Sequence, residues 1–169
     1  TVYEPVIFSL LFTLKSRQQS AAEISQMIAG VQNLVQIGRT DDATRRFIDY
    51  WSGEGAWNQF SVQQKLAMSE KISTVLVNFE AIISEFNLLA QLSNLTIPTL
   101  CLYGEHSPKP TVGLTQLLAQ LLPDSIIKPQ AGMGHMGPVT HSRSINQVVK
   151  QFIYNLSSTF GESQQPLAA

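Results

Sequence analysis

The sequence of 169 residues has few charged side chains and no excess of either sign. Lysine, arginine, aspartate and glutamate make up 14% of the chain, against about 25% in an average soluble domain. Eleven basic and twelve acidic residues leave a formal net charge of −1, which offers no basic surface to nucleic acid or to an anionic membrane. So little surface charge favours contact with further polypeptide, either a second copy of the chain or a missing segment.

Cysteine and long apolar runs are also scarce. The single cysteine, Cys101, excludes an internal disulfide, and a reducing cytoplasm is the simplest location for such a chain. No apolar run approaches the roughly 20 residues that a membrane-spanning helix requires. The apolar segment 6–14 lacks the basic region and cleavage site of a signal peptide. Three scattered histidines form no metal-ligand pattern, and we expect neither a metal nor a cofactor.

The first half of the sequence is dominated by helical periodicity. Over about residues 20–35, apolar side chains recur at three- and four-residue spacing, which predicts an amphipathic helix. A second helix is expected over residues 40–51. Ser61 and Gln64 form a capping-box pattern ahead of a third, long helix whose apolar side extends to Phe86.

The second half changes to short apolar runs without alternation. Residues 99–103 form such a run, ended by Gly104, which is typical of a strand buried on both faces of a parallel sheet. A helix is expected over residues 111–122 and a short strand over 125–128. A glycine-rich loop, 131–138, then precedes the last helix. The pattern predicts an α/β protein with a small parallel sheet.

The first residues read as the end of a strand that Pro5 interrupts. Two or three short parallel strands leave an apolar edge, and such edges are normally paired or covered. We therefore expect either an N-terminal half that precedes Thr1, or a second copy of the chain that pairs with this edge.

Three stretches in a fixed order resemble the C-terminal half of the α/β-hydrolase fold. YEP at residues 3–5 resembles the end of its sixth strand, and IPTLCLYGE at 97–105 resembles its seventh strand with the following turn. GMGHMGPVTH at 132–141 resembles the loop after the eighth strand, which bears the catalytic histidine. The helical block in between, with FIDYWSG at 47–53 and GAW at 55–57, is similar to the inserted cap, or lid, of bacterial members.

The resemblance implies a division of the chain into four parts. Residues 1–14 would end the sixth strand of the hydrolase core, and residues 15–92 would form the helical cap. Residues 93–160 would supply the C-terminal core, and residues 161–169 a frayed tail. The predicted fold class is thus a partial α/β-hydrolase fold: the final parallel strands of the sheet with a helical cap insertion.

The resemblance also implies a catalytic role for His135. Glycines on both sides of it permit the tight turns that present an imidazole at a strand end. Ser107 stands where many members carry the catalytic aspartate, and a serine supplies no negative charge. Some α/β-hydrolases carry the acid at the end of the sixth strand instead, where Glu4 stands, so the resemblance implies Glu4 as the acid, with Glu105 as its rival. The alternative for His135 is a histidine that merely caps or fills a loop. The alternative for Glu4 and Glu105 is an ordinary solvated or hydrogen-bonded carboxylate.

Four further residues are candidates for binding a small-molecule substrate: Trp51, Trp57, Phe60 and Met136. The three aromatic rings, together with Phe79, would line a pocket under the cap, or they would simply pack in its interior. His106 and His141 are expected to be structural or exposed, and Cys101 to be a buried strand residue rather than a nucleophile.

The sequence lacks the remaining part of such a site. Members of the fold carry the nucleophile in a G-x-S-x-G motif upstream of the acid and the histidine, and the sequence contains no such motif. We expect the whole protein to be a serine hydrolase for an ester, thioester or carbon–carbon bond of a small apolar substrate, and this chain to be inactive alone. The alternative is a non-catalytic fragment or interaction module that forms a homodimer through its open sheet edge.

Overall fold

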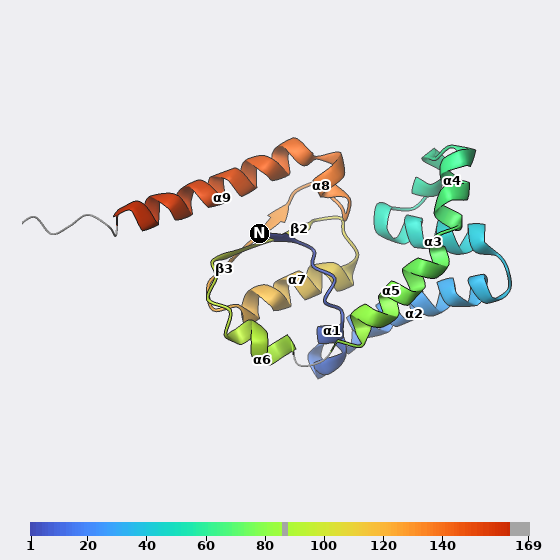
Figure 1. The fold of residues 1–169 in the computed structure, drawn as a ribbon, viewed down its shortest axis with the longest axis horizontal. Coiled ribbons are helices and arrows are strands. Elements are labelled where there is room, and N and C mark those ends of the chain that lie inside the picture. The colour runs from blue at the N-terminus through green and yellow to red at the C-terminus, as the bar shows by residue number, and fades with distance from the viewer. Residues whose placement is uncertain (86–87, 163–169) are drawn as a thin grey trace, which may run out of the picture.

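A computed structural model describes residues 1–85 and 88–162, which form a small sheet beside a block of helices (Figure 1). The first half contains β1 (Val2–Tyr3), α1 (Ser9–Thr13), η1 (Lys15–Arg17), α2 (Gln18–Gln36), α3 (Thr40–Ser52), η2 (Ala56–Gln59), α4 (Val62–Ser69) and α5 (Ile72–Ile83). The second half contains α6 (Leu88–Ser93), β2 (Thr99–Gly104), α7 (Lys109–Leu121), β3 (Ser125–Gln130), α8 (Gly137–Thr140) and α9 (Ser142–Glu162). The elements η1 and η2 are short 3-10 helices.

The three strands form a parallel sheet in the order β1-β2-β3. Val2 pairs with Cys101, and Thr99–Gly104 pairs along its whole length with Ser125–Gln130. The central strand β2 is therefore the one predicted from the unbroken apolar run, and the prediction of a parallel sheet is confirmed. The other strand of the second half extends two residues beyond the predicted 125–128.

Helices cover both faces of the sheet (Figure 1). On one face, Leu100 and Leu102 pack with Ile145 of α9. On the other face, Cys101 packs with Leu118 and Leu122, at the end of α7. All three strand residues are fully buried, which explains why the run shows no alternation.

A second, larger core lies among α1, α2, α3, α5 and α7. Its fully buried side chains include Phe8, Ile24, Val31 and Leu114. Because Leu114 belongs to α7, which also covers the sheet, the helical block and the sheet region share one helix. In Figure 1, α2 to α5 gather at one side of the sheet, at the end where β2 leads toward α7.

The long helix predicted after Ser61 is instead two helices. The capping box of Ser61 and Gln64 is present at the start of α4, but the chain leaves the helix after Ser69 and begins α5 at Ile72. The side chain of Val62 remains 75% exposed, whereas Ile72 is 2% exposed. The apolar periodicity of the sequence continues across the break, but only the apolar side chains of α5 pack in the helical core. The chain therefore changes direction between α4 and α5.

Two predictions touch residues outside the described range. Phe86, assigned to the long helix, lies there, as do residues 163–169 of the predicted tail; α9 itself extends through Glu162. None of the helices in the described part of the chain has both the length and the apolar character needed to cross a bilayer.

Candidate active site

The candidate site lies where the carboxyl ends of the strands meet. Glu4 directly follows β1, Gly104 ends β2, and His135 occupies the loop between β3 and α8. Parallel strands present their carboxyl ends at one edge of a sheet, and ligands of open α/β sheets bind there. The strand order therefore brings together residues that are far apart in the sequence.

Glu4 and His135 are in direct contact. Glu4 Oε2 and His135 Nδ1 lie 2.7 Å apart, between residues separated by 131 positions in the chain. The Glu4 side chain is completely buried, and the His135 side chain keeps 24% of its surface exposed. A carboxylate on Nδ1 fixes the orientation of the ring and leaves Nε2 for another partner.

The rival acid, Glu105, lies elsewhere. It is exposed, and its Oε2 accepts a hydrogen bond from the Gly132 backbone N–H at 3.1 Å. Glu105 is thus hydrogen-bonded to the start of the glycine-rich loop, whereas Glu4 contacts the imidazole.

The second oxygen of Glu4 is held by the turn after β2. Oε1 accepts a hydrogen bond from the Gly104 N–H at 2.7 Å and another from the Ser107 hydroxyl. Burial alone would raise the pKa of Glu4, but hydrogen bonds from His135, Ser107 and Gly104, with the charge of His135, hold the pKa below its ordinary value. The Glu4 backbone has a φ of 45°, a conformation that is uncommon for residues other than glycine and is found at functional sites.

The loop that carries His135 is hydrogen-bonded to β1 and to the turn after β2. The Tyr3 hydroxyl donates to the Gly134 carbonyl at 2.6 Å, and the His106 N–H donates to the Met133 carbonyl at 2.8 Å. Burial, followed by the negative charge of Glu4, raises the pKa of Tyr3 to about 12. The phenol therefore stays protonated near neutral pH and keeps its role as a donor.

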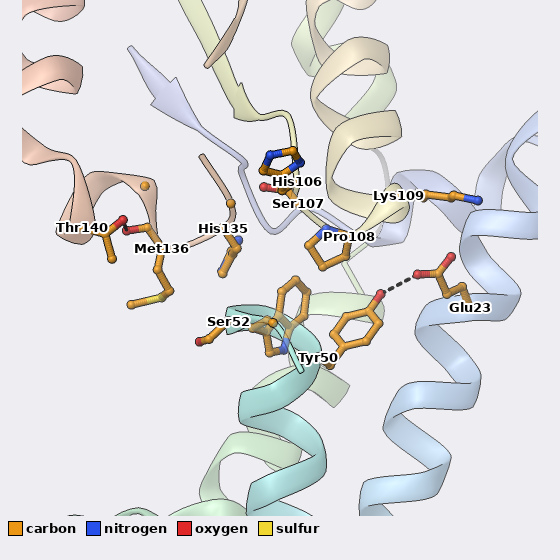
Figure 2. A pocket seen from close by; sticks show the side chains of 14 residues that line it. Glu23, Tyr50, Ser52, His106, Ser107, Pro108, Lys109, His135, Met136 and Thr140 are labelled. Carbon is orange, nitrogen blue, oxygen red and sulfur yellow. Dashed lines mark hydrogen bonds between the residues drawn. The ribbon is translucent and has the colours of Figure 1, made fainter. Parts of the chain in front are cut away.

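The helical block contributes an aromatic surface to the site. The indole ring of Trp51, from α3, lies against the His135 imidazole with ring centroids 4.6 Å apart. Beside these rings opens a pocket of about 530 Å³. It is lined by Glu23, Tyr50, Trp51, Ser52, Gly53, His106, Ser107, Pro108, Lys109, Gly134, His135, Met136, Gly137 and Thr140. Figure 2 shows Met136 and His135 on one side of it and Tyr50 with Glu23 on another.

The candidate substrate-binding residues fall into two groups. Trp51 and Met136 line the pocket. Trp57 and Phe60 are absent from its lining and instead pack against each other, with ring centroids 6.4 Å apart. Phe79 belongs to the helical core, where it stacks on Phe8.

Several pocket residues had no sequence signal that pointed to them. Tyr50 donates a hydrogen bond to Glu23 across α3 and α2 at 3.0 Å, the contact dashed in Figure 2. The sequence identifies Ser107 only as the residue at the usual position of the acid, three residues after Gly104, and not as a partner of Glu4. His106 and His141 are exposed. Within the described residues, no group of three or more histidine, cysteine or acidic side chains could hold a metal ion.

Comparison with known proteins identifies the fold. No family model and no curated protein sequence matches the chain. Among solved structures, it is similar to a bromoperoxidase from Bacillus anthracis, with 18% identity and a TM-score of 0.53 over 79% of this chain and 49% of that one. It is also similar to MenH from S. aureus, with 17% identity and a TM-score of 0.55 over 80% of this chain and 54% of that one.

The chain thus spans about half the length of these two structures. Together with the parallel order β1-β2-β3, the similarity shows that the chain has part of the α/β-hydrolase fold. The predicted fold class is confirmed.

Proposed function

We propose that the chain supplies the acid and the base of a serine-type hydrolase. The observation that supports this most directly is the contact of 2.7 Å between Glu4 Oε2 and His135 Nδ1. In such a site the nucleophile's proton moves to Nε2 of the histidine and then to the leaving group, while the acid holds Nδ1 and stabilises the imidazolium. The buried, ionised Glu4 carboxylate meets the requirements of that acid.

In this proposal residues 15–92 act as a cap over the site. Trp51 packs on the imidazole, so a helix of this segment covers the reacting group. The substrate is a small, largely apolar molecule held in the pocket, in which an ester, thioester or carbon–carbon bond is cleaved. The indole of Trp51 and the side chain of Met136, which both line the pocket, favour apolar contact.

The nucleophile lies outside this sequence in our proposal, because no G-x-S-x-G is present in it. An N-terminal half would add the elbow serine and the oxyanion hole, and the 169 residues alone would be inactive. We place the protein in the cytoplasm, where the lone thiol of Cys101 stays reduced.

An active-site label tests this directly. We expect a fluorophosphonate probe to modify the protein purified from its source, and the labelled serine to map outside these 169 residues. The isolated chain should hydrolyse p-nitrophenyl acetate no faster than its His135→Ala variant. A labelled serine within the sequence, or clear turnover above that variant, would overturn the proposal.

A second candidate function is a homodimeric interaction module. The strand order puts β1 at an edge of the sheet, and a second copy could pair with this edge about a two-fold axis. Sedimentation of the chain at micromolar concentration should then show a dimer. A strictly monomeric profile contradicts this candidate and leaves the first untouched.

A further inference from the structure

We propose that Ser107 is a positioning residue, whose hydroxyl, with the Gly104 N–H, orients the Glu4 carboxylate toward His135. The inference rests on the proposed pairing of Glu4 with His135. It gives a function to the serine that stands where many members of the α/β-hydrolase fold carry an aspartate.

The two oxygens of Glu4 have separate partners. Oε1 accepts from Gly104 and Ser107, both of the turn that follows β2, while Oε2 faces the imidazole. A carboxylate can accept about four hydrogen bonds, and its burial makes any unpaired oxygen costly. With Oε1 held from one side, rotation of the carboxyl group away from His135 breaks two hydrogen bonds.

Ser107 is itself held in a tight turn. Its N–H donates to the Gly104 carbonyl at 3.2 Å. Gly104 also lies so close to the His135 loop that an added Cβ would stand 2.5 Å from the Met133 carbonyl oxygen. The turn therefore contacts Glu4 through the Ser107 side chain and the Gly104 N–H. Its backbone also lies against the loop that carries His135.

The chemistry of serine suits this task. A hydroxyl donates a hydrogen bond without adding charge, so the buried site contains one carboxylate rather than two repelling ones. Within residues 1–85 and 88–162, the groups that face Glu4 are the His135 imidazole from the loop after β3, Gly104 at the end of β2 and Ser107 after it, and neighbouring Tyr3, whose hydroxyl donates to the loop. Trp51, from α3, is uncharged and contacts the imidazole.

Nuclear magnetic resonance on the intact 169-residue chain provides the test. One signal is the side-chain carboxyl carbon of Glu4, titrated with pH and assigned from its loss in Glu4→Gln. The other is the downfield proton on His135 Nδ1, assigned from its loss in His135→Ala. Both signals report on the pair without needing the nucleophile or a substrate.

We expect Ser107→Ala to raise the pKa of Glu4 and to speed solvent exchange of the Nδ1 proton by about tenfold, the factor typical of one lost hydrogen bond to a charged group. Ser107→Thr keeps the hydroxyl and should restore both signals to near wild-type values. Ser84→Ala is the matched control, because Ser84 is exposed and donates to the Glu80 carbonyl in a remote helix.

The outcomes separate this inference from the proposed function. If Glu4→Gln leaves the Nδ1 proton unchanged, the pair itself is wrong. If Glu4→Gln removes that signal while Ser107→Ala matches wild type, the pair stands and the role of Ser107 is refuted. Equal losses in Ser107→Thr and Ser107→Ala also refute it, because the hydroxyl would then not be the cause. Circular dichroism of each variant confirms that the fold is kept.

Discussion

The indole of Trp51 and the imidazole of His135 lie 4.6 Å apart between centroids, with their planes at 42°. The contact joins a helix of the first half to the loop after the last strand. Trp51 is itself anchored, because its ring also packs near Phe8 and Phe79 in the helical core. A residue of the helical block thus forms part of the immediate surroundings of the histidine.

This contact predicts a change in fluorescence when the imidazole is removed. The chain has two tryptophans, so Trp51 becomes the only indole in a Trp57→Phe variant. We expect its emission to rise when His135→Gln is added to this background, because the imidazole that lies against the indole and quenches its excited state is then absent.

The control adds His106→Gln to the same Trp57→Phe background, since His106 is exposed and its ring has no contact with Trp51 among those found in the described residues. Its emission should match that of Trp57→Phe alone. Unchanged emission in the His135→Gln variant would contradict the prediction.

Glu4 predicts an acid-sensitive contribution to stability. Its pKa in the folded protein lies below the ordinary value of 4.5, so the ionised carboxylate stabilises the fold above that pH. The contribution is lost as the pH falls through the lowered pKa. Urea unfolding between about pH 7 and pH 3 should show a steeper loss of unfolding free energy for wild type than for Glu4→Gln.

Glu105→Gln is the matched control for this experiment, since the Glu105 carboxylate is exposed; it should follow the wild-type slope. Parallel slopes for wild type and Glu4→Gln would contradict a lowered pKa at Glu4.

The burial of Glu4 gives a further prediction at neutral pH. Glu4→Ala should lower the unfolding free energy by about 1–3 kcal/mol, because it leaves buried donors without an acceptor.

Two glycines are predicted to differ in their tolerance of alanine. At Gly104, an added Cβ would lie 2.5 Å from the Met133 carbonyl oxygen and 2.7 Å from that of Gly134. The backbone must shift, and we expect Gly104→Ala to lower the unfolding free energy by about 1–3 kcal/mol. At Gly134, the nearest atom to such a Cβ is the His106 carbonyl oxygen at 3.9 Å, so Gly134→Ala should melt much closer to wild type. Equal melting temperatures would contradict the close approach of β2 to the loop.

Cys101 is predicted to be unreactive in the folded chain. The residue is completely buried, and burial raises the pKa of its thiol. Reagents therefore have little access to the sulfur, and little of it is in the reactive thiolate form. We expect labelling by a disulfide reagent to be slower than in urea by a factor on the order of a thousand, because it requires opening of the core. Rapid stoichiometric labelling of the native chain would refute this, and Cys101→Ser provides the blank.

The elements that the sequence predicted well are those with local signals. The helix predicted over 40–51 is Thr40–Ser52, and the one predicted over 20–35 is Gln18–Gln36. Helix α7 begins at Lys109, slightly before the predicted start, because proline is tolerated in a first helical turn. The break between α4 and α5 had no such signal. It depends on which apolar side chains reach the core, which is a tertiary property.

The same distinction applies to the site. The resemblance in sequence implied Glu4 and His135 as site residues, and the structure brings the two into contact; their roles as acid and base stay a proposal. The hydrogen bonds of Ser107 to Glu4 and of Tyr3 to Gly134 could not be inferred, because each requires the relative positions of two separate segments. The aromatic character of Trp57 and Phe60 does not by itself distinguish a pocket wall from a packed interior, and the two rings pack against each other outside the pocket lining.

The separation of 131 positions between Glu4 and His135 has a consequence for the order of folding. The helices between them form from neighbours in sequence, whereas the pairing of Val2 with Cys101 closes a long loop at a cost in chain entropy. We expect the pair to be among the last contacts formed. Its resonance signals would therefore report arrival at the native topology, at a stage when helical circular dichroism is already complete.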